Sequence, residues 1–547
     1  MFFRKITSRK KGKEYNYLKL IENYRDGNKI KQRVVANLGS LDDLTPEKVQ
    51  GLISGLARIC GIPGTGNLKA QKVLSHGEVL AIHKIWEILN LEEAVNRALS
   101  GQKADESIPL CLELMVLNQV IRPGDIKALD EWCRCLYLPR LEGRELSPGQ
   151  FHKALETVTA VKDELERHLY KRLAETMPLQ TDPSFILVTS AVLEPTPRRG
   201  LNLSPYGRYL LDEPEEVNKV DLLVAADREG LPYAHRVLSK AMDIAEMEDM
   251  VRRLRDNFGV ARCLFAGESG TGAGNKLSLA RAGGFEYVIG RKPKPGRDRA
   301  LLQELSPDGK GYQASAENVL FKEIKHGGTR HLLCLNRQVA GQVNDALDEQ
   351  VRLIELELRA IQREMAGNRS KNAVYGKNAP VLQDRACRRF FEWNFDRSKG
   401  EFTYRLKEDL LLQEKKMAGH YVIETNTGAM GAKELLHTFA RTLELADNFR
   451  VVKNFTDKPG HLFNVQNIAG SVFVSFLAAV VEKTLEKIIN SAGVRLTSRQ
   501  ALELLEEIKV TINLIDGREV KTVTRTEQIH DDILSAVGVS SLKRTIV

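Results

Sequence analysis

A glycine-rich segment between Gly267 and Lys276 follows an apolar run and precedes an expected helix, which is where a phosphate-binding loop would lie. In such a loop a lysine reaches the terminal phosphates, and the Ser or Thr after it holds Mg²⁺ through its hydroxyl. Here Leu277 follows Lys276, and Asn275 stands where the last glycine belongs. Nucleotide binding through this segment is therefore the least favoured of three functional hypotheses.

Histidines and cysteines give no metal-binding pattern. His420, His437 and His461 lie near one another in the sequence, but their spacing matches no zinc-binding motif. The chain has seven cysteines and no CxxC pair, which favours reduced thiols in the cytoplasm over a disulfide framework or a structural zinc site. Metal ligation by histidine or cysteine is therefore set aside.

The first 35 residues concentrate the positive charge of the chain. They contain eleven Lys and Arg against three acids, 11 − 3 = +8, whereas the whole chain carries +9. Such a cluster can bind a phosphate backbone, because each cation that pairs with a phosphate releases a condensed counterion. A solvated basic surface is the alternative that charge alone leaves open. The cations expected to contact DNA in this segment are Arg4, Lys5, Arg9, Lys10, Lys29, Lys31 and Arg33.

A second basic segment, Arg385 to Trp393, interleaves cations with aromatic residues. This pattern can grip phosphate and stack on an unpaired base. A strand with an aromatic core face explains the same pattern equally well, and both interpretations stay open.

The elements that must position these residues differ along the chain. Tyr15–Asn23 and Lys29–Asn37 alternate polar with apolar residues around an Asp-Gly turn, which predicts a β-hairpin. Its second strand would display Lys29, Lys31 and Arg33 on one face. From Thr45 to about Met177 the apolar spacing is helical throughout.

An α/β pattern begins near Ser184 with an apolar, β-branched strand. The expected order is three strands, a helix at Ile244–Phe258, a strand, a helix at Lys276–Ala282 and a strand. The strand HYVIETN and two helices, Ala432 to about Phe455 and Val465–Asn490, follow much later. The expected domains are 1–44, a basic hairpin region; 45–178, a helical, DNA-binding domain; 179–292, the first part of the core; 293–417, an insertion; 418–492, the last part of the core; and 493–547, a tail with a helix and a hairpin.

Composition fits a folded cytoplasmic protein. Hydrophobic residues make up 42% and charged residues 28% of the chain, as in ordinary globular proteins. The longest apolar stretch, Ser471–Val481, is short and runs into a charged helix, which indicates a core helix rather than a membrane span. The first residues lack the apolar run of a secretory signal.

The helix expected from Ala432 to about Phe455 contains the segment Phe449-Arg450-Val451-Val452-Lys453. This segment resembles the C-terminal signature of bacterial insertion-sequence transposases of the DDE class. Other parts that resemble the same family, in the same order, are YNYLKLIENYRDGNKIKQRVVANLGSLDDL, VDLLVAADREGLPYAHRVL, LFAGESGTGAGNKLSLARAGGFEYVIGRK and HYVIETN. The resemblance covers almost the full chain and points to the branch with a strand-rich insertion before the last acid. It implies a ribonuclease-H-like core, double-stranded DNA with terminal inverted repeats as partner, Mg²⁺ or Mn²⁺ as cofactor, and allows a homodimer.

This family needs three carboxylates around two divalent ions, which activate the attacking hydroxyl and stabilise the leaving oxygen. The resemblance aligns the three acids with Leu187, Gly267 and Ala446, none of which has a carboxyl group. The basic residues of the signature, Arg450 and Lys453, would share one helix face with Ala446. The nearest acids that could substitute are Glu268 and Asp447, followed by Glu444 and Asp182.

The resulting prediction is an α/β fold with a ribonuclease-H-like core and an insertion, preceded by a basic hairpin and a helical domain. An intact relative would bind its element ends and catalyse DNA strand cleavage and transfer. In this chain the catalytic step is predicted to be impaired. The alternatives are a catalytically dead or repurposed DNA-binding protein and, less favoured, a nucleotide-binding enzyme.

Overall fold

The computed structural model describes most of the chain, in two compact units that are considered separately. The described residues are 1–10, 13–27, 29–60, 69–101, 105–123, 126–193, 219–238, 242–269, 274–293, 301, 303–305, 310–315, 319–326, 329–365, 379–396, 398–452, 465–515, 518–542 and 545–546. One unit comprises residues 1–76, 507–527 and 541–547, and the other comprises residues 77–506 and 528–540.

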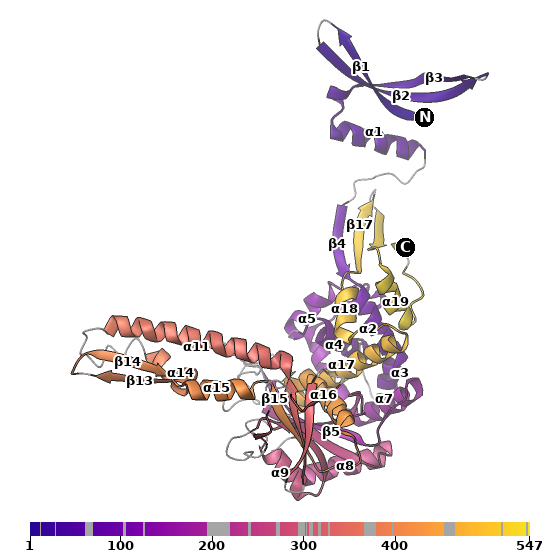
Figure 1. The fold of residues 1–547 in the computed structure, drawn as a ribbon. Helices are drawn as coiled ribbons and strands as arrows, with labels where there is room; N and C mark the ends of the chain where they lie inside the picture. The colour runs from indigo at the N-terminus through magenta and orange to yellow at the C-terminus, as the bar shows by residue number, and fades with distance from the viewer. Residues whose placement is uncertain are drawn as a thin grey trace. The chain divides into compact units, whose positions relative to one another are not determined.

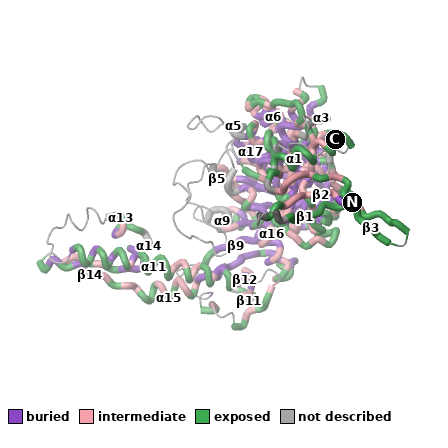
Figure 2. The backbone as a smooth tube through the Cα atoms, turned by 90° about the horizontal axis from the view of Figure 1, so that it is seen from above, coloured by how far each residue is buried: buried purple, intermediate pink, exposed green. Residues whose placement is uncertain are grey.

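The smaller unit begins with a three-stranded antiparallel sheet, β1 (Phe2–Lys10), β2 (Lys13–Asp26) and β3 (Lys29–Ser40) (Figure 1). The predicted hairpin is confirmed, and Gly27 in its turn has a φ of 60°, which glycine adopts without strain. The sheet is followed by η1 (Leu41–Asp43) and helix α1 (Pro46–Ile59). Figure 2 shows that most of β1–β3 is exposed or only partly covered.

A second sheet in this unit joins two distant parts of the chain. Its order is β19 (Thr545–Ile546), β18 (Arg518–Val523), β17 (Lys509–Ile515) and β4 (Lys69–Ser75). The prediction that 45–178 is helical throughout is therefore wrong at β4. Strand β4 has only seven residues, and its partner β17 lies more than 400 positions later in the sequence. So short a segment has too weak a local pattern to be predicted as a strand from the sequence. The hairpin of β17 and β18 confirms the one predicted in the tail.

The larger unit consists of a large sheet and many helices, some of which precede the sheet in the sequence and some of which follow its strands. Its helices are α2 (Gly77–Ile88), α3 (Leu91–Ala98), α4 (Ile108–Ile121), α5 (Ile126–Cys133), α6 (Pro148–Ala160), α7 (Lys162–Thr176), α8 (Ile244–Phe258), α9 (Gly274–Ala282), α11 (Arg337–Met365), α13 (Ala379–Gln383), α14 (Arg385–Phe390), α15 (Glu408–Met417), α16 (Ala432–Arg450), α17 (Val465–Ser491), α18 (Ser498–Leu505) and α19 (Gln528–Ala536).

Helix α17 is the centre of the helical part. It packs against α2, α4, α6, α16 and strand β7 (Pro232–Val237). Its segment Ile468–Ser491 is the one described helix long and apolar enough to cross a membrane, but 83% of its apolar window is buried inside the fold. Burial on all sides explains its apolar composition, as expected for a core helix.

The large sheet has the predicted order of elements at its centre. Its strands are β5 (Ser184–Leu193), β6 (Lys219–Ala226), β7, β8 (Cys263–Ser269), β9 (Glu286–Arg291), β10 (Gln313–Ala314), β11 (Val319–His326), β12 (Thr329–Asn336), β15 (His420–Thr425) and β16 (Val451–Val452). Their spatial order is β10-β11-β12-β15-β9-β8-β5-β6-β7, with β16 beside β5. Strands β5, β8 and β9 run parallel, whereas β6 is antiparallel to both of its neighbours, β5 and β7.

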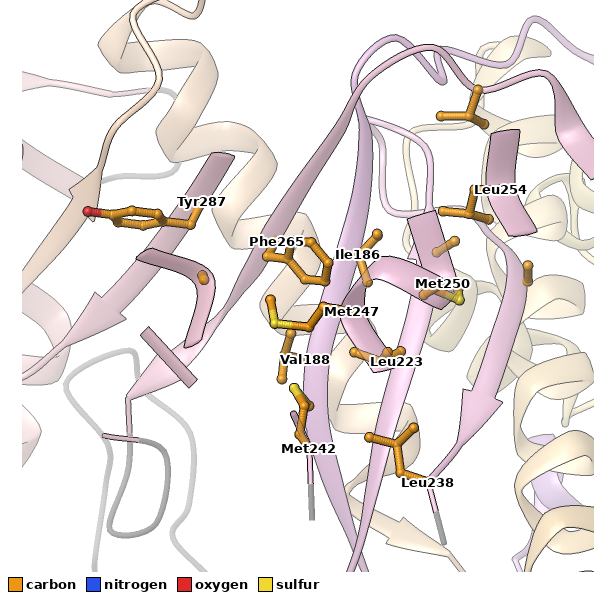
Figure 3. Packing of buried hydrophobic residues seen from close by; sticks show 14 of the residues in the cluster. Ile186, Val188, Leu223, Leu238, Met242, Met247, Met250, Leu254, Phe265 and Tyr287 are labelled. Carbon is orange, nitrogen blue, oxygen red and sulfur yellow. The ribbon is translucent and has the colours of Figure 1, made fainter. Parts of the chain in front are cut away.

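Two hydrophobic clusters cover the two faces of this sheet. Figure 3 shows one of them, in which Ile186, Val188 and Phe265 of the sheet meet Met247 and Met250 of α8. On the other face, Phe185, Leu264 and Ala266 pack against the apolar stripe of α16. Strand residues alternate between the two faces of a sheet. The cluster to which a strand residue belongs therefore shows to which face its neighbours along the strand point.

The segment 293–417 was predicted to be an insertion, yet part of it belongs to the main sheet. Strands β11 and β12 extend the sheet through β15, since the backbone of β12 pairs with β15 from Arg330 to Leu335. Helices α11, α14 and α15 with strands β13 (Phe391–Asp396) and β14 (Glu401–Leu406) form a separate small core. In that core Phe390 and Phe391 are buried and Trp393 stacks on Phe402, which favours the packing interpretation of Arg385–Trp393.

Candidate functional site at the junction of two strands and a helix

Leu187 lies in the middle of the sheet, beside the position expected for the second acid. In the parallel pair of β5 and β8, Leu187 is the register partner of Ala266, the residue before Gly267. Both side chains point to the face covered by α16, because Phe185 and Leu264 do so two residues earlier. The sheet therefore brings the first two expected positions onto adjacent strands.

Helix α16 lies along β5 and carries the third expected position, Ala446. At its start, Glu434 accepts a hydrogen bond from Arg228 (Nη1 to Oε1, 2.6 Å), and Arg228 also donates to the carbonyl of Asp182, just before β5. Just after its end, Val451 and Val452 pair with Val192 and Leu193 at the far end of β5. Leu435, Leu436, Phe439 and Leu443 of α16 pack in the cluster on this face of the sheet. Ala446 is buried too and follows Leu443 by three positions, which puts it on the same side of the helix.

Helix α16 is shorter than predicted. It ends at Arg450 instead of about Phe455, because Val451 and Val452 leave the helix to pair with β5. Lys453, which was expected to continue the face of Ala446, lies outside the described residues.

The side chains at the three expected positions are apolar and buried. Leu187 is 1% exposed and Ala446 is 5% exposed. Gly267 is buried, and alternation turns it toward α8, where a Cβ atom would lie 2.8 Å from the carbonyl oxygen of Val188. That approach is too close for a real Cβ, so the backbone of β5 occupies the space that an acid at 267 would need.

Glu268 is an acid beside this junction, on β8. Alternation along β8 points its half-buried side chain to the α16 face, two residues beyond Ala266. The other substitutes do not join it. Asp447 is exposed and is rotated by ~100° from Ala446 around the helix. Asp182 precedes β5 by two residues and lies about 16 Å from Leu187 at ~3.3 Å per residue.

Glu444 is committed to a different network. Its carboxylate accepts hydrogen bonds from Arg441 (2.8 Å) and from Lys483 of α17 (3.1 Å). Burial opposes ionisation of Glu444, but these two cations hold its pKa below the ordinary value. Its carboxylate therefore helps to join α16 to α17.

A divalent metal ion does not fit the residues at the junction. Leucine, glycine and alanine side chains have no oxygen to donate, and Mg²⁺ and Mn²⁺ require several oxygen ligands. Among the described residues, no group of three or more His, Cys, Asp or Glu is placed to hold a metal ion. Binding of Mg²⁺ or Mn²⁺ stays a prediction from the resemblance and lacks a ligand set.

The basic face of the N-terminal sheet is confirmed in register but is partly neutralised. Lys31 forms an ion pair with Asp26 (2.6 Å), and Arg33 forms one with Glu22 (2.6 Å) on the neighbouring strand. Lys29 pairs with Asp26 across the hairpin backbone. Lys5 lies on the same face as these residues, whereas Arg4 lies on the opposite face and donates to Gln32 (3.1 Å). For Arg9, Lys10 and Arg450 only the backbone is described.

A largely buried charged cluster on α7, β7 and α8 was not predicted. Glu166 of α7 contacts His235 of β7 (Oε1 to Nδ1, 2.6 Å), Lys162 (3.0 Å) and Arg253 of α8 (2.5 Å). His235 also stacks on Phe476 of α17, with centroids 4.7 Å apart. Burial and Lys162 lower the pKa of His235 to about 4, although Glu166 opposes this. These four residues come from three separate elements, so no local pattern indicates the cluster.

An ion pair between Asp227 and Lys487 also joins the sheet to a helix. Asp227, in the turn between β6 and β7, accepts hydrogen bonds from the backbone of Glu229 (3.0 Å) and Leu231 (2.8 Å) and pairs with Lys487 of α17 (2.8 Å). The predicted turn is thus also an anchor for the central helix.

Comparison with known proteins identifies the N-terminal region. Residues 3–68 match the family model described as IS1634 family transposase, N-terminal domain. This match supports an insertion-sequence transposase and, with it, DNA as the partner in general. No curated protein matches the chain at a significant level.

Proposed function

We propose that this chain is a DDE-type insertion-sequence transposase whose acids have been replaced, so that it binds DNA without cutting it. The observation that carries the proposal is the junction of β5, β8 and α16. The resemblance requires three acids to converge, whereas the corresponding positions on β5, β8 and α16, Leu187, Gly267 and Ala446, are buried and have no carboxyl group. Strand β5 pairs with β8, and α16 packs against both, which supports the proposal. We infer that β5–β9 with α8, α9 and α16 form the ribonuclease-H-like core and that 293–417 contains the family's insertion.

The N-terminal match supports DNA as the partner, and the charge of that region supplies the affinity. Affinity for a duplex would fall with salt, since phosphate contacts release counterions. Terminal inverted repeats are the proposed target, because the resemblance implies them. In this proposal the junction contributes packing alone, and no step passes through a metal ion.

A second candidate is a transposase that works with a displaced acid. The observation in its favour is Glu268, which lies on the α16 face next to the junction. One carboxylate without the other two is a poor site for two divalent ions. The nucleotide-binding alternative depends on a loop of which residues 270–273 lie outside the described residues.

The test uses the purified full chain with DNA that flanks its gene, and with a duplex of scrambled sequence. Binding is measured by fluorescence anisotropy at several salt concentrations, and strand cleavage is measured on gels with Mg²⁺ or Mn²⁺. We expect salt-dependent binding and no cleavage. Cleavage that disappears in Glu268→Ala but persists in the exposed control Asp447→Ala would establish the displaced-acid candidate. Absence of binding to either duplex at low salt would overturn DNA binding itself.

A further inference from the structure

The two faces of the β1–β3 sheet differ in charge, although the sequence places acids and bases close together. In β2 the even-numbered residues share one face and the odd-numbered residues share the other. Contacts confirm this division: Glu22 pairs with Arg33, Asp26 pairs with Lys31, and Arg33 lies over the ring of Tyr24 at 5.6 Å. We call this surface the mixed face.

All carboxylates within the three strands lie on the mixed face. The sequence has three acids from residue 1 to residue 40, and all of them occupy even positions of β2: Glu14, Glu22 and Asp26. Together with the cations Lys5, Lys29, Lys31 and Arg33, whose register puts them on the same side, the described side chains sum to +4 − 3 = +1.

The opposite surface, which we call the cationic face, has no acid in these strands. It presents Lys19 and Arg25 from β2, and Arg4, which is the register partner of Lys19 in β1. Its charge is +3 from described side chains. Arg4 also donates to Gln32 (3.1 Å), which bonds Asn23 (3.0 Å), so polar groups bridge all three strands on this side.

Aromatic and apolar residues support the cations on the cationic face. Tyr15 and Tyr17 follow the same odd register as Lys19, and Tyr15 is 41% exposed. Ile21, the only described residue of the three strands that is buried, lies between Phe2 and Val34 in the next row. The aliphatic stems of Lys19 and Arg4 can rest on this row while their charges face outward.

We propose that the cationic face of β1–β3, through Arg4, Lys19 and Arg25, contacts the phosphate backbone of double-stranded DNA. The inference rests on the proposed function and names the surface that performs it. Lys19 and Arg25 are six positions apart on one strand, about 20 Å at ~3.3 Å per residue, a span of about six base-pair steps. The Tyr15 hydroxyl can donate to a further phosphate oxygen.

Charge separation explains why this face is preferred to the predicted one. A phosphate that approaches Lys31 or Arg33 also approaches Asp26 or Glu22, so attraction and repulsion largely cancel. On the cationic face, the described residues of the three strands include no acid that would oppose this attraction. The mixed face, which includes Lys29, Lys31 and Arg33, then serves mainly to hold β2 against β3.

The experiment compares two triple variants of the full chain with equal loss of charge. Arg4→Ala, Lys19→Ala and Arg25→Ala empty the cationic face, and Lys29→Ala, Lys31→Ala and Arg33→Ala are the matched control. Binding of a short labelled DNA duplex is measured by anisotropy between about 50 and 200 mM salt. We expect the first variant to bind at least ~10-fold more weakly, with a salt slope lower by about 2 to 3, because up to three phosphate contacts are lost. The control should change the slope by less than about 1.

The outcomes separate this inference from the proposed function. If the unmodified chain binds DNA and the control variant loses as much affinity as the first or more, the choice of face is wrong although DNA binding stands. If the unmodified chain shows no salt-dependent binding, the proposed function fails, and the inference fails with it. A third variant, Arg4→Lys, Lys19→Arg and Arg25→Lys, should keep the slope; a loss there as large as in the alanine variant would indicate a folding defect and overturn the assignment of phosphate contacts.

Discussion

The β5–β8–α16 junction and the N-terminal sheet differ in what their residues do. At the junction every expected functional position is buried and apolar, and the side chains contribute to a core that spans strands and helix. In β1–β3 a single described residue, Ile21, is buried, and most side chains are exposed. Packing therefore maintains the first region whether or not it has a chemical role, whereas the second keeps a charge pattern that packing alone does not explain.

Introducing a charge at the junction should have the largest effect on the free energy of unfolding, and it tests this comparison. Leu187→Asp, a change toward the family's pattern, should lower the free energy of unfolding by about 3–5 kcal/mol, because it buries an unpaired carboxylate. Urea denaturation followed by circular dichroism measures this. The control Leu187→Met keeps the apolar volume and should cost less than about 1.5 kcal/mol. A nearly neutral Leu187→Asp would show that the junction still accommodates an acid.

Acidification should weaken the larger unit through its buried cluster. The pKa of His235 is lowered to about 4, so the unfolded chain takes up a proton on this residue before the folded chain does. The stability is then fully present above pH ~6.5 and is lost as the pH falls from there through about 4. Chemical denaturation as a function of pH, with His235→Gln as the comparison, measures the slope. Equal slopes for both proteins would exclude His235 as the cause.

Restoring the second acid should also destabilise the fold. In Gly267→Asp the new Cβ would lie 2.8 Å from the carbonyl oxygen of Val188, so β5 and β8 must move apart. We expect a loss of about 1–3 kcal/mol, as for other overpacked sites. Gly267→Ala introduces the same Cβ without charge and separates the two contributions. Wild-type stability in the alanine variant would mean that the strands yield easily.

The smallest effect is expected in the N-terminal sheet. Replacing Lys31 or Arg33 with alanine removes an exposed ion pair and should change stability by less than ~1 kcal/mol. Thermal unfolding of the full chain at low and high salt measures this. A larger loss would mean that these pairs hold the sheet together, and the contrast with the junction would disappear.

Much of the core could be predicted because its strands and helices have strong local patterns. Helix α8 was predicted with the bounds Ile244–Phe258 that it has, and the strand at Ser184 begins and ends where its apolar run does. Pairings across long distances could not be predicted. Strand β4 is short and has its partner at the other end of the chain, and β16 ends α16 early through a contact with β5.

At the candidate site, too, some features could be predicted from the sequence and others depend on the pairing of strands. The positions Leu187, Gly267 and Ala446 came from the resemblance, and they lie on the neighbouring strands β5 and β8 and on helix α16, which packs against both. The direction of Gly267 and the proximity of Val188 depend on the sheet register and are not visible in the sequence. In the basic hairpin, Lys31 and Arg33 were identified correctly as one face. Their acids on β2 were present in the sequence too, and alternation along that strand would have revealed the pairs.

The pairing of β4 with β17 has a consequence for how this chain is made. Lys69–Ser75 is synthesised more than 400 residues before its hydrogen-bonding partner, Lys509–Ile515. The sheet of β4, β17, β18 and β19 cannot form before those later residues are synthesised, and β4 has no strand partner on either edge until then. A product that stops anywhere before residue 509 leaves β4 with two unpaired edges, whereas the complete sheet leaves it with one.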